Sequence, residues 1–143
     1  MLGKNVVHSR GKDDWQTPLW LYDLLDEQYQ FGLDAAACPF STLAPNFYSE
    51  QICGLKNSWQ GYGNVFVNPP YSKNSRFVEK AYKESILSDA SPIICMLLPS
   101  RTDVKWWHSF VMRAAEIIFI KGRLTFRDKG IAASAGAGLP SCV

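Results

Sequence analysis

A polar side chain, two prolines and an aromatic ring follow a short apolar run that is typical of a buried strand. The segment reads Asn68-Pro69-Pro70-Tyr71. Because proline lacks a backbone N–H and holds the preceding residue in extended geometry, this corner is predicted to be stiff. The Asn68 side-chain oxygen and the Pro69 carbonyl oxygen are then two fixed acceptors beside the flat ring of Tyr71. Two acceptors next to a stacking face suit a planar group that carries an amine.

An amine attached to an aromatic ring is a poor nucleophile, because its lone pair is delocalised into the ring. Two acceptors that hold its hydrogens draw the nitrogen toward tetrahedral geometry, and preorganised acceptors do so at little cost during the reaction. No strong base is needed, so an asparagine can serve. The electrophile must come from a cofactor, and a sulfonium methyl donor fits an in-line transfer.

Alternating strands and helices are predicted to position this corner. Thr17 is expected to cap the first helix, with Pro18 in its first turn, and Thr102 is expected to cap the last. This alternation predicts an α/β fold with a mostly parallel sheet and a C-terminal β-hairpin. The helices are expected over residues 18–30, 75–88 and 103–114, and the strands over residues 31–37, 65–67, 92–98, 116–121 and 123–126.

Asp34 and Asn68 each follow an apolar run that is predicted to be a strand. In parallel α/β sheets, ligands bind outside the carboxyl ends of the strands. If the two strands are neighbours, both side chains lie on one edge of the sheet. The long segment between them, residues 38–64, is expected to be an ordered loop region because aromatic residues are frequent in it.

Length and composition limit the possible classes of protein. The chain has 143 residues, 47% of them apolar, and a net charge of +2, which fits one globular domain over residues 15–143 after a flexible arm at 1–14. No apolar run is long enough to cross a membrane, and the polar amino end does not resemble a signal peptide, so a cytoplasmic protein is expected. The four cysteines lack metal-binding spacing, and no metal site is predicted.

The corner resembles the catalytic motif of amino-methyltransferases that use S-adenosylmethionine, which have a Rossmann-like fold. Further stretches resemble the small phage-type DNA N6-adenine methyltransferases, in the same order and with similar spacing over roughly residues 13–143. These stretches are Trp15-Gln16-Thr17-Pro18, Leu33-Asp34-Ala35-Ala36-Ala37, Gly54-Leu55 with Trp59, and Gly122-Arg123-Leu124-Thr125-Phe126.

This resemblance implies a role for each matching residue. Asn68, Pro69 and Pro70 would form the catalytic corner, and Tyr71 would stack on the base. A DNA adenine would be flipped out of the duplex to reach them. The residues implied to bind S-adenosylmethionine are Trp15, Thr17, Pro18, Asp34, Ala35, Ala36 and Asn68. Four basic residues are candidates for contacts with DNA: Lys73, Arg76, Arg101 and Arg123.

The sequence departs from the family pattern in three places. Asp34 is followed by alanines rather than by the glycine-rich loop of many methyltransferases, and Cys53 stands where many relatives have an acidic residue. The family pattern also continues with an apolar strand, so the chain is expected either to be truncated or to lack its last strand. Two alternatives therefore stay open: methylation of protein glutamine or RNA guanine, and a non-catalytic remnant that binds nucleic acid.

Overall fold

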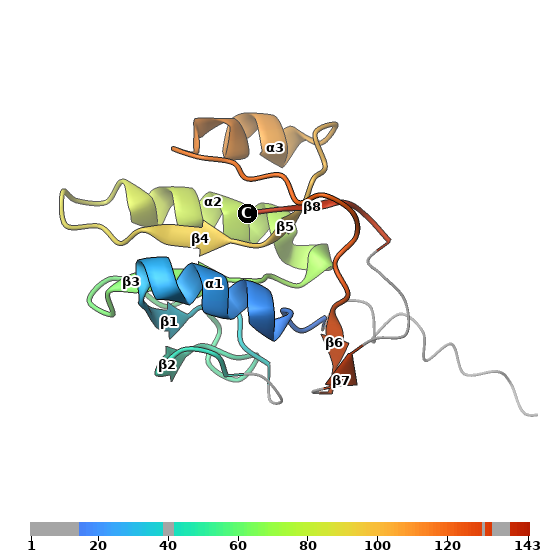
Figure 1. Ribbon diagram of the computed structural model, residues 1–143. Helices are drawn as coiled ribbons and strands as arrows, with labels where there is room; N and C mark the ends of the chain where they lie inside the picture. Colours follow the sequence, from blue (N-terminus) through green and yellow to red (C-terminus); the bar gives the residue numbers. More distant parts are fainter. Residues whose placement is uncertain (1–14, 39–41, 130, 133–137) are drawn as a thin grey trace, which may run out of the picture.

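A four-stranded parallel sheet forms the centre of the computed structural model, which describes residues 15–38, 42–129, 131–132 and 138–143 (Figure 1). The predicted arm over residues 1–14 lies outside these described residues. The strand order is β2-β1-β3-β4. The strands are β1 (Phe31–Asp34), β2 (Asn46–Phe47), β3 (Asn64–Val67) and β4 (Ile94–Met96). The prediction of an α/β fold with a mostly parallel sheet is confirmed.

Helices cover both faces of this sheet. Successive side chains of β3 point to opposite faces, so the strand contacts a helix on each side. Phe66 packs in one apolar cluster with residues of α1 (Leu19–Tyr29). Val65 and Val67 pack in a second cluster with residues of α2 (Asn74–Ser85). All three side chains of the strand are fully buried. The strand before the corner is therefore held by packing from both sides, which is typical of a parallel sheet.

The path of the chain reverses direction across the sheet between β1 and β3. From β1 the chain passes to β2 on one side, and it then returns to β3 on the other side. Asp34 pairs in register with Phe66, two residues before Asn68. The expected neighbourhood of the two strands is thus confirmed, and their carboxyl ends meet at a topological switch point, where open α/β sheets bind ligands.

Antiparallel pairs make up the rest of the described strands. β5 (Leu98–Pro99) pairs with β8 (Ser141–Cys142), and β6 (Arg127–Asp128) pairs with β7 (Ile131–Ala132). A C-terminal antiparallel pair is therefore present as predicted, but β6 and β7 form it, and the predicted strand over residues 123–126 was wrong. Leu124 and Phe126 do alternate inward as expected, yet they fill the α1-side core instead of pairing with a strand.

Residues 116–121 were also predicted as a regular strand, and the structure gives only an extended segment with one isolated bridge, between Phe119 and Cys142. Its backbone bonds are made to the carboxyl end of the chain. Ile118 and Val143 exchange two hydrogen bonds, with N···O distances of 2.7 and 2.9 Å.

Two predicted helix starts were wrong. The N-cap of α1 is Pro18, with no side-chain capping bond, so Thr17 does not cap this helix. The predicted helix over residues 103–114 is α3 (Lys105–Ser109) with N-cap Val104, followed by a separate 3₁₀ turn, η2 (Val111–Arg113). The break falls at Phe110, whose backbone is not helical and whose ring packs 5.6 Å from that of Tyr82 on α2. Contact with α2 thus overrides the local helical pattern.

None of the helices in the described part of the chain combines the length and apolar character that crossing a membrane requires.

Candidate active site at the ends of β1 and β3

The corner after β3 begins where the sheet pairing ends. The Val67 carbonyl accepts the last hydrogen bond across the sheet, from Leu97 N–H at 2.9 Å. The Pro70 carbonyl then accepts Lys73 N–H at 2.9 Å and closes a 3₁₀ turn, η1 (Tyr71–Lys73). The corner is therefore fixed on its strand side by the sheet and on its far side by this turn. We refer to residues 34–37 and 68–71 together as the rim.

The Asn68 side chain is oriented by residues that lie more than 50 positions earlier in the sequence. Its amide nitrogen donates to the Trp15 carbonyl at 2.9 Å and to the Thr17 hydroxyl oxygen at 3.0 Å. A primary amide has two N–H donors, so both are used by these contacts. The remaining polar atom of this side chain is Oδ1, which can only accept a hydrogen bond.

Asp34 lies beneath the loop that leaves β1, with 3% of its surface exposed. Its carboxylate accepts the Ala36 N–H at 3.2 Å. Burial raises the pKa of Asp34 to about 7, although hydrogen bonds from the backbone of Ala36 and Leu43 act in the opposite direction. The side chain therefore organises the loop from below, and its charge changes near neutral pH.

Two residues of the Gly54-Leu55…Trp59 pattern support this loop from the other side. The Trp59 indole is fully buried and donates to the Gly54 carbonyl at 2.8 Å. A Cβ atom at position 54 would lie 2.1 Å from the Ala35 carbonyl oxygen, so only glycine fits there. Cys53 contributes through its carbonyl oxygen, which accepts the Asn57 side-chain N–H at 2.9 Å. The pattern thus has a packing role directly under the rim.

A long-range contact that the sequence did not reveal holds the segment over residues 15–17. Gln16 and Arg127 exchange two backbone hydrogen bonds of 2.9 Å, and the Arg127 Nε donates to the Thr17 carbonyl at 2.9 Å. Thr17 and Gln16 are buried, as is Pro18, whereas Trp15 is half-buried. No local pattern could have indicated this contact, because it joins residues 110 positions apart.

The predicted basic residues stand in different settings. Lys73 and Arg76 are exposed and follow the corner directly, in η1 and at the start of α2. Arg123 is exposed in the segment before β6. Arg101 forms two hydrogen bonds of 3.0 and 3.2 Å with the carboxylate of Asp103, which raises the pKa of its guanidinium. Lys73 and Arg76 are thus the two that chain continuity places beside the rim.

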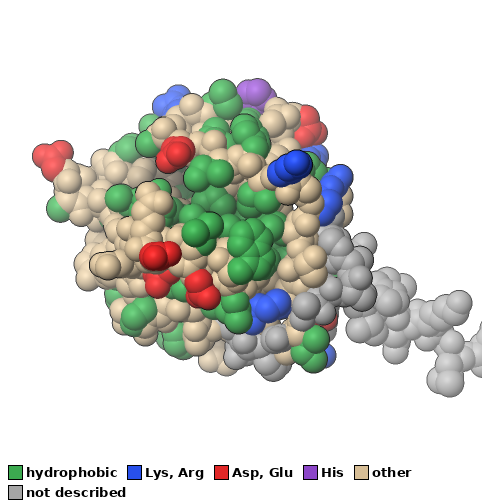
Figure 2. All heavy atoms as spheres, viewed as in Figure 1, with side chains coloured by type: hydrophobic (Ala, Val, Ile, Leu, Met, Phe, Trp, Pro, Cys, Tyr) green, Lys and Arg blue, Asp and Glu red, His purple; other side chains and the backbone are tan. Residues whose placement is uncertain are grey.

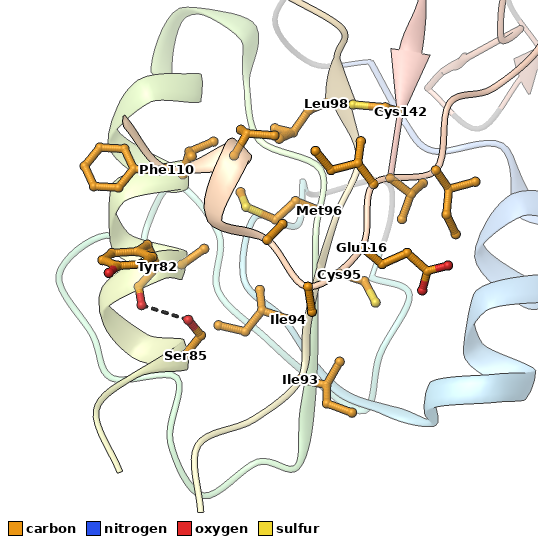
Figure 3. A pocket seen from close by; sticks show the side chains of 18 of the residues that line it. Tyr82, Ser85, Ile93, Ile94, Cys95, Met96, Leu98, Phe110, Glu116 and Cys142 are labelled. Carbon is orange, nitrogen blue, oxygen red and sulfur yellow. Dashed lines mark hydrogen bonds between the residues drawn. The ribbon is translucent and has the colours of Figure 1, made fainter. Parts of the chain in front are cut away.

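A second concave region lies along the outer edge of β4 and contains none of the predicted site residues (Figure 3). This cavity, which we call the slot, has a volume of about 540 Å³. Ile94, Cys95 and Met96 line one wall, and residues 113–118 line the other. Figure 2 shows apolar side chains gathered between α1 and α3 on the corresponding face. Its lining suits apolar contacts rather than polar chemistry.

Comparison with known proteins decides the family. A family model described as DNA N-6-adenine-methyltransferase (Dam) matches residues 4–140. The chain belongs to this family. It is 36% identical over 115 residues to a DNA N-6-adenine-methyltransferase of Escherichia phage T1, an alignment that covers 80% of this chain and 47% of that protein. It is 32% identical over 122 residues to the DNA N-6-adenine-methyltransferase of Haemophilus phage HP1, covering 84% of this chain and 69% of that protein.

The chain thus spans about half the length of the phage T1 relative. No solved structure matches it. The Dam family resemblance noted at the sequence level is confirmed by these matches. The reduced α/β architecture with its C-terminal antiparallel pairs agrees with a methyltransferase fold.

Proposed function

We propose that this chain transfers a methyl group from S-adenosylmethionine to the N6 amine of adenine in DNA. The observation that carries the proposal is the orientation of Asn68 at the switch point of the sheet. With both amide hydrogens donated to Trp15 and Thr17, its oxygen is the atom available to the substrate side. Membership of the Dam family supports the choice of adenine in DNA over other planar amines.

The residues of the corner have separate tasks in this reaction. Asn68 Oδ1 and the Pro69 carbonyl oxygen accept the two hydrogens of the adenine amine, and the Tyr71 ring stacks on the base. Pro70 fixes the turn between them. The bond from N6 to the methyl carbon would form as the carbon–sulfur bond of the donor breaks and leaves a neutral thioether, and N6 would then lose one proton to solvent. The acceptors are fixed before the substrate arrives, so little reorganisation is required during the transfer.

The donor molecule supplies an activated methyl group on a positively charged sulfur. The residues at the end of β1 fit such a molecule, because the side chains of Ala35 and Ala36 are small and the Asp34 carboxyl holds the loop from below through the Ala36 N–H. Asn68 borders the same space. Trp15, Thr17 and Pro18 would close it from the amino-terminal side, since Trp15 and Thr17 bond directly to Asn68 and Pro18 follows them in the chain.

DNA would approach along the exposed basic residues near the rim, Lys73 and Arg76, with Arg101 and Arg123 further along the chain. The adenine must be flipped out of the duplex, which costs a few kcal/mol in lost stacking and pairing. Binding that depends on such residues weakens as the salt concentration rises, because counterions are released from the phosphates. The cytoplasm of the producing cell offers both DNA and the donor.

The test is transfer of a labelled methyl group from S-adenosylmethionine to unmethylated DNA, followed by identification of the methylated nucleoside. N6-methyladenine is expected, and Asn68→Ala should abolish its formation without loss of the fold. A panel with RNA and a glutamine-containing peptide tests the other amine substrates. DNA binding without binding of S-adenosylmethionine in calorimetry would instead support the non-catalytic alternative. Absence of transfer by a folded, donor-binding preparation would contradict the proposal.

A further inference from the structure

The orientation of a side-chain amide decides what it can do in this site. An asparagine amide has two orientations that differ by exchange of its oxygen and nitrogen. In one, Oδ1 is available to accept a substrate N–H; in the other, the amide presents donors that would repel that N–H. A reaction that needs an acceptor at this point therefore also needs a device that selects the first orientation.

The Trp15 carbonyl and the Thr17 hydroxyl provide this selection. A carbonyl oxygen can only accept, so the reversed orientation would set Asn68 Oδ1 against the Trp15 oxygen, now 2.9 Å from the amide nitrogen. The Thr17 hydroxyl oxygen accepts the second N–H at 3.0 Å. The hydroxyl is not used to cap α1, whose N-cap is Pro18 without a side-chain bond. The hydroxyl oxygen instead accepts the hydrogen bond from the asparagine of the corner.

Both acceptors are held by the C-terminal hairpin. Arg127, the first residue of β6, bonds to Gln16 through two backbone hydrogen bonds and to the Thr17 carbonyl through its Nε. In Figure 1 the segment that enters α1 runs beside β6. Residues from the first and last fifths of the sequence thus meet at the side chain that follows β3.

We propose that Thr17 is a positioning residue for Asn68, and that Arg127 holds Thr17 in place for this role. Together they fix the amide with Oδ1 toward the substrate amine. This proposal rests on the proposed methyl transfer and assigns Thr17 a contact with Asn68 in place of a helix cap. A weakened orientation lowers the fraction of productive complexes, so it acts on the chemical step more than on binding.

The deciding experiment compares Thr17→Val, which removes the hydroxyl but keeps the shape, with Thr17→Ser, which keeps the hydroxyl. In Thr17→Val, kcat should fall roughly 10- to 100-fold, the scale of a misplaced reacting group, while KM for DNA and for S-adenosylmethionine changes less than about twofold. Thr17→Ser should restore most of kcat. Thr102→Val, at an exposed threonine outside the site, is the matched control.

Arg127→Lys removes the Nε contact while it keeps the charge and the backbone pairing. It should lower kcat by a smaller factor than Thr17→Val does, again with little change in KM. If Thr17→Val leaves kcat unchanged, or if only KM rises, the proposal is overturned. Should Thr17→Val fail to fold, Thr17→Ser and Arg127→Lys still give the comparison of kcat with KM.

A second measurement separates this proposal from the proposed function. The side-chain amide of Asn68 gives a pair of ¹H–¹⁵N signals, which Asn68→Ala assigns by their loss. In Thr17→Val at least one of the pair should shift and exchange faster with solvent. If the wild type transfers no methyl group, the proposed function fails, and this spectrum still decides the contact. Asn68 signals that stay unchanged in Thr17→Val would overturn the proposed role of Thr17.

Discussion

The rim and the slot lie on the same sheet, but they are built in opposite ways. At the rim the Asn68 amide nitrogen donates to two partners more than 50 positions away, and directly under the rim the backbone at Gly54 leaves no room for even one extra carbon. The slot is lined mostly by apolar side chains around about 540 Å³ of space. The rim can therefore orient a reacting group, whereas the slot can only accept apolar volume. The same kind of substitution should have opposite effects in the two places.

The largest effect on stability is expected from adding a carbon under the rim. Gly54→Ala would place Cβ 2.1 Å from the Ala35 carbonyl oxygen, a backbone atom that cannot rotate away. We expect a loss of about 3 kcal/mol in the free energy of unfolding, typical of overpacking a tight site. Urea denaturation measures this loss. A variant as stable as the wild type would contradict this prediction and would show that the loop over residues 34–37 can move to accommodate the added carbon.

A change of charge at the corner is expected to have the next largest effect. Asn68→Asp replaces both N–H donors by acceptors, so a carboxylate oxygen would face the Trp15 carbonyl. Methyl transfer should fall about 100-fold at pH 8, which corresponds to about 2.7 kcal/mol. The loss should be smaller at pH 6, because a protonated carboxyl can donate to Trp15. The pH profile of kcat measures this, and equal losses at both pH values would contradict it.

The titration of Asp34 predicts a pH dependence of stability. Its pKa in the folded protein, about 7, lies above the ordinary value of 3.8, so the folded state favours the protonated form. The stabilisation from the protonated carboxyl is fully present below about pH 4. It is lost as the pH rises through 7, and the free energy of unfolding falls by up to about 1.4 kcal/mol per pH unit in this range. Asp34→Asn should therefore gain stability relative to the wild type between pH 5 and 8. The test is to measure the melting temperature of both proteins across this pH range. The same pH dependence in both proteins would contradict the prediction.

The smallest effect should come from adding carbon atoms to the slot. Ala115 is exposed and lines the slot, so Ala115→Leu can fill part of it. We expect a gain of about 0.5–1 kcal/mol in the free energy of unfolding, as is common for cavity filling. Methyl transfer should not change, since the slot contains none of the corner residues. A destabilised Ala115→Leu protein would show that the two regions respond alike.

The sequence predicted the part of the site that follows from local rules. The corner is encoded by its prolines, and parallel strands must end at one edge, so the shared rim of Asp34 and Asn68 could be anticipated. Thr17 shows where such rules fail. A threonine before a proline and an apolar helix has the pattern of a cap, yet its hydroxyl accepts a bond from a residue 51 positions later. Only the tertiary fold contains that information.

The C-terminal third was predicted less well for a related reason. Leu124 and Phe126 alternate with exposed residues, which is the pattern of a strand. Alternation reports which side chains face the core, but a strand also requires a backbone partner. Besides its hairpin partner in β7, Arg127 pairs with Gln16, and neither of these two residues carries an apolar signal that would indicate the pairing. Burial was therefore predictable at these positions, and pairing was not.

The register of β8 has a practical consequence for anyone who attaches a peptide to this protein. Cys142 faces Leu98 and Val143 bonds to Ile118, and within the described residues β4 pairs only with β3. In this register the first position added after Val143 would lie opposite Met96, and the following ones opposite Cys95 and Ile94. Because the slot beside β4 is lined mostly by apolar side chains, apolar residues at these positions should be tolerated better than charged ones.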